Sequence, residues 1–417
     1  MFGIGIVTVE DRTSVTRSIG VAWKPSFETC FVIIADISLS SSMNRFIACA
    51  RDGINANAII PGGSGRNLGA SGSRFECASY HSVESTRPNK IRSQIKYGAN
   101  MTTDNMKIPA VGLGTWAWGD SGSSGDGYFG STLTRTGLEE LADRAHAAGF
   151  TLWDTAVVYG MGRSETVLGE VLKRFARSDF QLSTKFTPQA AGTGDDPMAD
   201  MLEQSLARLG TDYIDLYWIH NPGDVARWTP HLIPLLESGK IKHVGLSNHN
   251  LSQIVQANQI LGDAGYSVEA IQNHYSMLHR NSDQNGILDF CTKEGIPFFA
   301  YMVLEQGALT GKYNPQNPLP EGSNRAQAYN AKLPQMKSLT DRLGSIGRSH
   351  GAEAPDVAVA WAIAKGATPI IGVTKPNHID GLGRAAAIVL SNDDIVELEA
   401  LALAANVDTR GWWEQEM

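Results

Sequence analysis

From Lys107 onward, short apolar runs alternate with longer stretches in which apolar residues recur at helical spacing. The runs are rich in β-branched residues and lie at 110–115, 151–155, 180–185, 213–220, 243–247, 269–274, 297–301 and 369–373. Each run has the length and composition of a buried strand, and the alternation predicts βα units around a parallel sheet.

The stretch from 198 to 209 shows the helical pattern most clearly, with apolar residues at Met201, Leu202, Leu206 and Leu209. Asp196 and Pro197 before it and Gly210 after it are typical start and stop signals. Similar amphipathic stretches lie at 138–148, 164–175, 251–261 and 335–350. Eight strands, each followed by a helix, predict a (β/α)8 TIM barrel over residues 106–417.

Residues 1–105 show neither period and are rich in Ser, Gly, Asn and Arg. Residues 1–100 carry 11 Lys and Arg against 7 Asp and Glu, whereas the whole chain has a net charge of −8. We expect this extension to be disordered or the product of upstream translation, with Met101 or Met106 as the start. A targeting sequence and an accessory domain are the alternatives, and no function is assigned to the segment.

Composition narrows the class of protein. The chain is 42% hydrophobic and 19% charged, and it lacks an apolar run of the roughly 18 residues that a membrane helix needs. Its acidic balance argues against nucleic acid as a partner. Its four cysteines follow no zinc-ligand or CxxC spacing, so we expect no metal site. A small-molecule substrate, a monomer and a cytoplasmic location are predicted, with organelle import open if the extension is real.

Four chemically active side chains lie at or just beyond the ends of the second to fourth predicted strands: Asp154, Tyr159, Lys185 and His220. In a barrel these ends gather on one face, where the catalytic residues of such folds lie. Taken singly, each of the four could be purely structural: His220 as a buried histidine, Asp154 and Lys185 as a structural ion pair, and Tyr159 as a core aromatic residue.

Together, the four residues suit the reduction of a carbonyl by hydride transfer. The reaction leaves negative charge on oxygen, and Tyr159 can supply the proton once Lys185 lowers its pKa from about 10. Asp154 would hold Lys185 charged and in place. His220 can hydrogen-bond the carbonyl oxygen and orient it.

The order and setting of these residues closely resemble the catalytic tetrad of the aldo-keto reductase family. The resemblance is carried by VGLGTW (111–116), WDTAVVYGMGRSE (153–165), LSTKF (182–186) and DYIDLYWIHNP (212–222), and it continues to the C-terminus. It is nearer to the bacterial-type and channel-β-subunit-like branches than to the mammalian aldose reductase branch. It implies that Tyr159 is the general acid, that Lys185 and Asp154 tune it, and that His220 orients the substrate, beside Trp116 and Trp118 as aromatic walls.

The resemblance also implies a cofactor, NADPH (or NADP⁺). No GxGxxG motif follows a first strand, so a Rossmann nucleotide domain has no support, and the resemblance instead puts the cofactor at the barrel mouth. It places the nicotinamide end of the cofactor at Ser247, Asn248, Gln272 and Tyr301, and it gives Thr115, Trp116 and Asp154 as further cofactor contacts. It places the pyrophosphate at Met302, Leu304, Gln306, Gly307, Thr310 and Lys312, where small residues let backbone N–H groups approach. It places the adenosine end at Gly372, Thr374, Lys375 and His378, and a lysine at a helix start favours NADPH over NADH.

Two positions depart from the family pattern. Gly381 and Leu382 stand where many relatives have an acidic residue and an asparagine that hold the adenine, and Met302-Val303 stands where relatives often have Ser-Pro.

Two alternative functions follow from the resemblance: an NADPH-binding regulatory subunit of a channel with little turnover, and a dehydrogenase that runs the same chemistry in reverse. Channel subunits commonly have Asn at the His220 position, so His220 favours the enzyme.

Overall fold

The computed structural model of the chain describes residues 106–119, 125–411 and 414, and the backbone of five strands nearer the N-terminus. The chain divides into two units, Met1–Ile91 and Arg92–Met417. The strands of the first unit form one antiparallel sheet in the order β1 (Gly3–Val9), β2 (Arg17–Trp23), β3 (Cys30–Leu39), β4 (Ser42–Arg51) and β5 (Asn57–Ile59). No period of two or 3.6 in the sequence predicted these strands. Our expectation that residues 1–105 are disordered or non-native stays a prediction.

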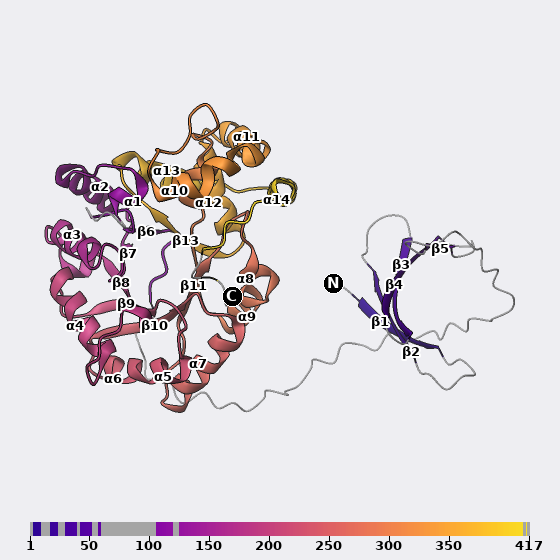
Figure 1. Ribbon diagram of the computed structural model, residues 1–417, viewed down its shortest axis with the longest axis horizontal. Coiled ribbons are helices and arrows are strands. Elements are labelled where there is room, and N and C mark those ends of the chain that lie inside the picture. The colour runs from indigo at the N-terminus through magenta and orange to yellow at the C-terminus, as the bar shows by residue number, and fades with distance from the viewer. Residues whose placement is uncertain are drawn as a thin grey trace. The chain divides into compact units, whose positions relative to one another are not determined.

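The second unit is a closed barrel of eight parallel strands, which confirms the predicted (β/α)8 fold (Figure 1). The strands pair in chain order, and β13 closes the barrel against β6. They are β6 (Gly112–Gly114), β7 (Leu152–Asp154), β8 (Gln181–Phe186), β9 (Ile214–Ile219), β10 (Ile241–Ser247), β11 (Ala270–His274), β12 (Phe298–Tyr301) and β13 (Ala367–Gly372).

Helices surround the barrel. The longer ones are α2 (Arg135–Ala147), α3 (Arg163–Leu172), α4 (Pro197–Leu209), α7 (Leu251–Asp263), α9 (Ile287–Glu294), α11 (Leu333–Ser349), α12 (Ala354–Ala364), α13 (Pro376–Ala387) and α14 (Asn392–Ala405). The short ones are α1 (Asp126–Phe129), α5 (Val225–Trp228), α6 (Leu232–Glu237), α8 (Asn281–Gln284) and α10 (Asn324–Tyr329), and 3-10 turns lie at 177–179, 188–190, 229–231, 305–310 and 330–332.

Helix α4 begins and ends where its sequence predicts. The Asp196 side chain accepts a hydrogen bond from the Ala199 N–H, and Pro197 occupies the first helical position, where its missing N–H is not needed. Gly210 ends the helix with a φ of 67°, a conformation that glycine adopts without steric cost. Local chemistry therefore fixes both ends of this helix.

Apolar side chains fill two layers. Inside the barrel lie Leu152, Leu216, Trp218, Phe299 and Ile370, all buried, as the small cross-section of an eight-stranded barrel requires. Between the strands and the helices lies a larger set that includes the buried faces of α2, α4 and α11. The barrel is thus a packed scaffold, and functional groups are left to its rims.

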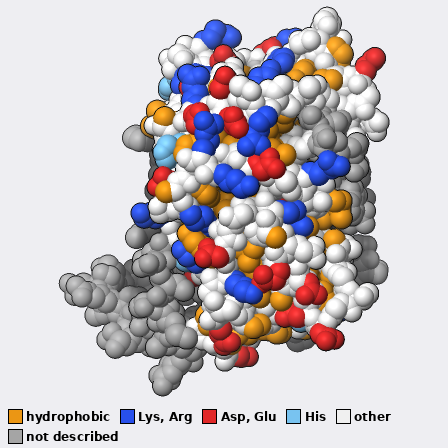
Figure 2. All heavy atoms as spheres, turned by 90° about the vertical axis from the view of Figure 1, so that its left-hand side faces the viewer, with side chains coloured by type: hydrophobic (Ala, Val, Ile, Leu, Met, Phe, Trp, Pro, Cys, Tyr) orange, Lys and Arg blue, Asp and Glu red, His pale blue; other side chains and the backbone are white. Residues whose placement is uncertain are grey.

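The helical surface carries charges of both signs. Figure 2 shows basic and acidic side chains interspersed over one side of the unit. Ion pairs on the outer helices account for part of this pattern, such as Arg135 with Glu139 and Glu170. Among the described residues, no helix is long and apolar enough to cross a membrane.

Candidate active site

A buried ion pair lies at the carboxyl end of strands β7 and β8. Lys185 Nζ lies 2.6 Å from Asp154 Oδ2, and the two side chains are 0% and 4% exposed. Lys185 also donates to the Thr155 carbonyl at 2.8 Å. Burial is the largest single influence and lowers the pKa of Lys185, but the charges and hydrogen bonds of Asp154 and Tyr159 together outweigh it and raise that pKa above its ordinary value. Lys185 is therefore held as a fixed cation.

Tyr159 lies in the loop between β7 and α3, and its hydroxyl oxygen accepts a hydrogen bond from Lys185 Nζ at 3.3 Å. Because the lysine donates to this oxygen, the phenol hydrogen is left to be donated elsewhere. Burial raises the pKa of Tyr159, and Lys185 acts against that rise without reversing it. Lys185 by itself lowers the pKa of Tyr159, as expected, but the net shift of that pKa is upward.

His220 follows β9, and its ring meets the Tyr159 ring edge-on with 5.9 Å between centroids. Burial and the nearby Lys185 charge hold the pKa of His220 well below its ordinary value, so the ring is neutral at physiological pH. Its Nδ1 lies 3.0 Å from the Thr187 hydroxyl. The structure thus brings together all four predicted catalytic residues, and it adds Thr187.

Strand β8 and the extended residue that follows it supply three polar groups at alternate positions: Ser183, Lys185 and Thr187. Ser183 donates to Asp154 Oδ1 at 2.5 Å and accepts from Trp218 Nε1 at 2.7 Å. Alternate residues of a strand point to the same face, so all three follow the direction of Lys185. We did not predict Ser183 and Thr187 as site residues, although this period of two was readable in the sequence.

Aromatic rings line one side of Tyr159. Trp116 stacks on Tyr159 with 6.0 Å between centroids and contacts Tyr128 and Phe129 at 5.2 Å each. These contacts agree with the prediction that Trp116 is a wall of the substrate pocket. Trp118 differs from its predicted place: it is fully buried, packs on Trp153, and donates to the Val373 carbonyl at 2.7 Å. Its neighbours make Trp118 part of the core and not a pocket wall.

The residues predicted for the nicotinamide end lie together at the carboxyl ends of β10, β11 and β12. Asn248 accepts from the Tyr301 hydroxyl at 2.5 Å and donates to the His220 carbonyl at 2.8 Å and to the Ser247 hydroxyl at 3.2 Å. Gln272 lies 3.4 Å from Asp154 Oδ1. Asn248 has a φ of 62°, which is unusual outside glycine and typical of functional positions. Hydrogen bonds therefore join these residues to the catalytic set.

Thr115 lies at the end of β6 and is fully buried. Its hydroxyl lies 3.2 Å from the Asp154 carbonyl and 2.8 Å from the Ser164 hydroxyl. The Ser164 hydroxyl in turn donates to the Thr115 carbonyl at 2.8 Å. In this structure Thr115 therefore braces the loop that carries Tyr159.

The loop after β12 was predicted to meet the pyrophosphate, and its backbone is contorted. Met302 and Gln306 have φ values of 61° and 52°, and Gly307 has one of 102°. Leu304 is half-buried, and the Thr310 hydroxyl donates to the Gly307 carbonyl at 2.6 Å. Arg325, which the sequence did not single out, donates from Nη1 to the Gln306 carbonyl at 3.3 Å while its buried Nε has no partner. A free guanidinium N–H beside this loop suits an anion.

Three basic residues meet near the start of α13. The pKa of His378 is lowered first by burial and then by the charges of Lys375 and Lys312, so both lysines act electrostatically on its ring. The Thr374 N–H donates to His378 Nδ1 at 3.3 Å, and a cavity of about 200 Å³ lies between this helix start and α2, lined in part by Thr374 and Lys375. Exposed Gly372 precedes them at the end of β13.

Gly381 and Leu382, which depart from the family pattern at the adenosine end, are buried in α13. Leu382 packs in the core, and a Cβ on Gly381 would lie 2.8 Å from Asp356 Oδ1. Asp356 in turn pairs with Arg384 at 2.7 Å. The space beside Gly381 is therefore taken by this ion pair, which gives a packing reason for the glycine.

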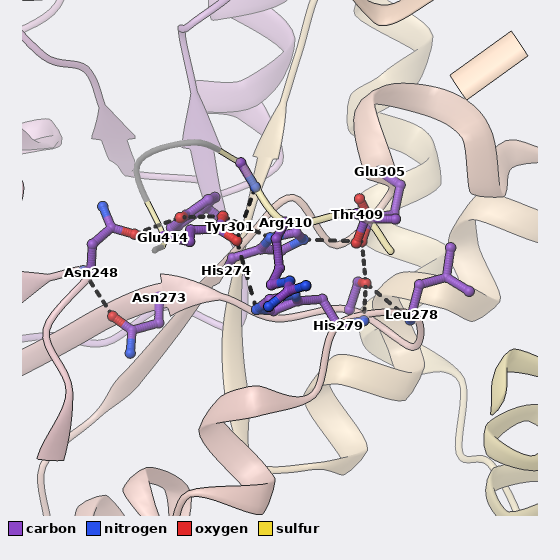
Figure 3. Close-up of polar contacts among 12 residues, drawn as sticks. Asn248, Asn273, His274, Leu278, His279, Tyr301, Glu305, Thr409, Arg410 and Glu414 are labelled. Carbon is purple, nitrogen blue, oxygen red and sulfur yellow. Dashed lines mark hydrogen bonds and ion pairs between the residues drawn. The ribbon is translucent and has the colours of Figure 1, made fainter. Parts of the chain in front are cut away.

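A second buried polar group joins the same rim of the barrel (Figure 3). His274, at the end of β11, lies between Glu305 and Glu414, with 3.0 Å from Nε2 and 2.8 Å from Nδ1 to the carboxylates. Together with His279 and Glu414 it is the group among the described residues with the composition to hold a metal ion. The sequence singled out none of these residues, and our expectation of no metal site stays a prediction.

Comparisons with known proteins agree with this geometry. The model of the Aldo/keto reductase family matches residues 110–403. A chloroplastic pyridoxal reductase of Arabidopsis thaliana is 30% identical over 315 residues, which cover 71% of this chain and 84% of the relative. Aldo-keto reductase str7 of Strobilurus tenacellus is 30% identical over 311 residues, which cover 71% of this chain and 89% of the relative.

Solved structures show the same barrel. An aldo/keto reductase of Klebsiella pneumoniae, solved in complex with NADP and acetate, is 25% identical with a TM-score of 0.55, and the match covers 70% of this chain and 91% of that one. A glycerol dehydrogenase of Gluconobacter oxydans has a TM-score of 0.60 at 24% identity, covers 72% and 95% of the two chains, and supports the fold alone.

Proposed function

Because the chain belongs to the aldo-keto reductase family, we propose that it reduces carbonyl compounds to alcohols with NADPH. Aldehydes are the favoured substrates, with ketones and keto-sugars next. The observation that carries the proposal is the fully buried Lys185, which is bonded to Asp154 on one side and to Tyr159 on the other. That arrangement places a proton donor beside a fixed cation, where a developing alkoxide is stabilised.

The protein's part in the reaction is to bind, orient and protonate. Ser247, Asn248, Gln272 and Tyr301 would hold the nicotinamide, whose chemistry when bound would be hydride transfer to the carbonyl carbon. Tyr159 donates its phenol proton to the carbonyl oxygen, and Lys185 stabilises the phenolate left behind. With the Thr187 hydroxyl as donor to His220 Nδ1, 3.0 Å away, Nε2 of this neutral ring would carry the hydrogen and bond the same oxygen.

NADPH, and not NADH, suits the charges around the phosphate sites. Lys375 at the start of α13 and the nearby Lys312 concentrate positive charge where we place the 2′-phosphate. Arg325 is the additional candidate ligand for the pyrophosphate. The NADP complex of the Klebsiella relative supports the same cofactor.

The test is NADPH consumption, followed by its absorbance, with the full chain, a chain that starts at Met101, and a panel of aromatic, aliphatic and sugar aldehydes. Tyr159→Phe should lower kcat by roughly 10²–10⁴ and leave the Kd for NADPH within about twofold, since the ring stays. Tyr128→Phe is a matched control that removes a neighbouring hydroxyl and should keep most activity. Full turnover in Tyr159→Phe would refute the mechanism, and tight NADPH binding without turnover on any carbonyl would favour the regulatory-subunit alternative.

A further inference from the structure

The segment that follows α14 reaches a position beside the residues proposed for the nicotinamide. Asn406, with a φ of 47°, ends the helix. Glu414 is 2% exposed, and its Oε1 lies 2.8 Å from His274 Nδ1 and 3.1 Å from the Tyr301 hydroxyl (Figure 3). Asn406 and Glu414 lie beyond residues 110–403, the stretch that the family model matches.

His274 anchors this carboxylate as a cation. Both of its ring nitrogens face carboxylates, Glu305 and Glu414, which requires a doubly protonated ring. Burial by itself lowers the pKa of His274, but Glu305 and then Glu414 raise it to about 9. Glu305 is held in turn by donors from Ser276, from Tyr329 at 2.7 Å and from Thr409 at 3.1 Å.

A metal ion explains this geometry less well than a hydrogen-bonded chain. His274 and His279 stack with 4.0 Å between centroids and an interplanar angle of 5°. The nitrogen lone pairs of two parallel imidazole rings lie in parallel planes and do not converge on one point. The lone pairs of metal ligands must converge on the ion. Both nitrogens of His274 are also already bonded to carboxylates.

The chain of hydrogen bonds continues into the active site. The Tyr301 hydroxyl has one hydrogen and two acceptors, Asn248 Oδ1 at 2.5 Å and Glu414 Oε1 at 3.1 Å. Asn248 then donates to the His220 carbonyl at 2.8 Å. The strained Asn248 backbone and the orientation of the Tyr301 ring are thus both connected to the C-terminal segment.

We propose that Glu414 is a positioning residue for the nicotinamide end of the cofactor site, acting through Tyr301 and Asn248. The C-terminal segment is then a working part of cofactor binding. The inference rests on the proposed function, because it takes Tyr301 as the platform for the ring and Asn248 as a ligand of the carboxamide.

The experiment measures the Kd for NADPH of the full chain by quenching of protein fluorescence, beside kcat at saturating NADPH. Glu414→Gln keeps the side-chain shape and removes the charge, so we expect the Kd to rise about tenfold, as for loss of a charge-assisted hydrogen bond. The kcat should stay within about twofold. Glu397→Gln removes an exposed carboxylate on α14, 51% exposed and paired with Arg342, and should change neither value.

A pH series separates positioning from a merely structural role. Because its pKa is raised to about 9, His274 is charged below that pH and loses its hold on Glu414 as the pH rises through it. The titratable groups that face its ring are Glu305, Glu414, His279 and Tyr301, whose ring stacks on it with 5.6 Å between centroids. The wild-type Kd should therefore rise between pH 8 and 10, and the Kd of Glu414→Gln should rise less.

The outcomes are distinct. An unchanged Kd in Glu414→Gln, with wild-type binding and a Tyr159-dependent turnover, would overturn this inference and leave the proposed function standing. A wild-type chain that binds no NADPH would overturn both. Weaker NADPH binding after treatment with EDTA would also overturn the inference, by showing that a metal ion holds the cluster.

Discussion

Replacing Lys185 with methionine tests whether the central ion pair is as demanding as its burial indicates. Lys185→Met keeps most of the side-chain volume but leaves Asp154, 4% exposed, without its cation. Removing one partner of a buried pair typically costs about 3–5 kcal/mol of unfolding free energy. Ser183 and Gln272 still donate to the carboxylate, so we expect a value near the lower end of that range. Even about 3 kcal/mol is a large part of the ~5–15 kcal/mol by which domains are stable.

The assay is urea unfolding followed by fluorescence, together with turnover. Asp154→Asn/Lys185→Met removes both charges and keeps an oxygen that can accept from Ser183. The double variant should regain most of the lost free energy of unfolding, because no unpaired charge remains buried. It should remain as inactive as Lys185→Met, because Tyr159 has lost its neighbouring cation in both.

Two results would refute this reasoning. A Lys185→Met chain with an unfolding free energy within about 1 kcal/mol of wild type would show that the pair is not effectively buried. A double variant that regains none of the lost free energy of unfolding would show that the cost comes from lost packing around the lysine stem, which both variants lack, and not from the orphaned charge.

Three further predictions follow. Thr187→Val removes the hydroxyl that faces His220 Nδ1 and should lower kcat about tenfold, about 1.4 kcal/mol, with the Kd for NADPH unchanged; equal kcat values would exclude the proposed role. Gly169→Ala places a Cβ 2.6 Å from the Arg208 carbonyl oxygen and should destabilise the fold by about 1–3 kcal/mol in urea unfolding. In Gly383→Ala the added Cβ has no atom within 4 Å, so this variant should instead stabilise the fold by up to about 1 kcal/mol. Equal changes in unfolding free energy at the two glycines would contradict the packing argument. Lys375→Ala should raise the KM for NADPH about tenfold, a typical cost for one charge-assisted contact, and leave the KM for NADH unchanged. Equal increases in the KM values for NADPH and NADH would refute the contact of Lys375 with the 2′-phosphate.

The fold was largely readable from the sequence because its signals are local. Each barrel strand is a short apolar run, and α4 begins at Asp196 and ends at Gly210 because capping depends on neighbouring residues alone. The four proposed catalytic residues could be named for a related reason. In a barrel, the carboxyl end of every strand lies on the same face, so a position along the chain gives a position in space.

Tertiary structure alone decided which groups meet across the barrel. Trp118 and Trp116 are two residues apart, yet one packs in the core against Trp153 and the other stacks on Tyr159. Glu414 reaches His274, 140 positions earlier, because the segment after α14 returns to the rim of the barrel. No periodicity encodes such a contact, since it depends on how distant elements are placed by packing. The net pKa of Tyr159 was likewise undecided by sequence, because burial, which exists only in the folded chain, outweighs the effect of Lys185.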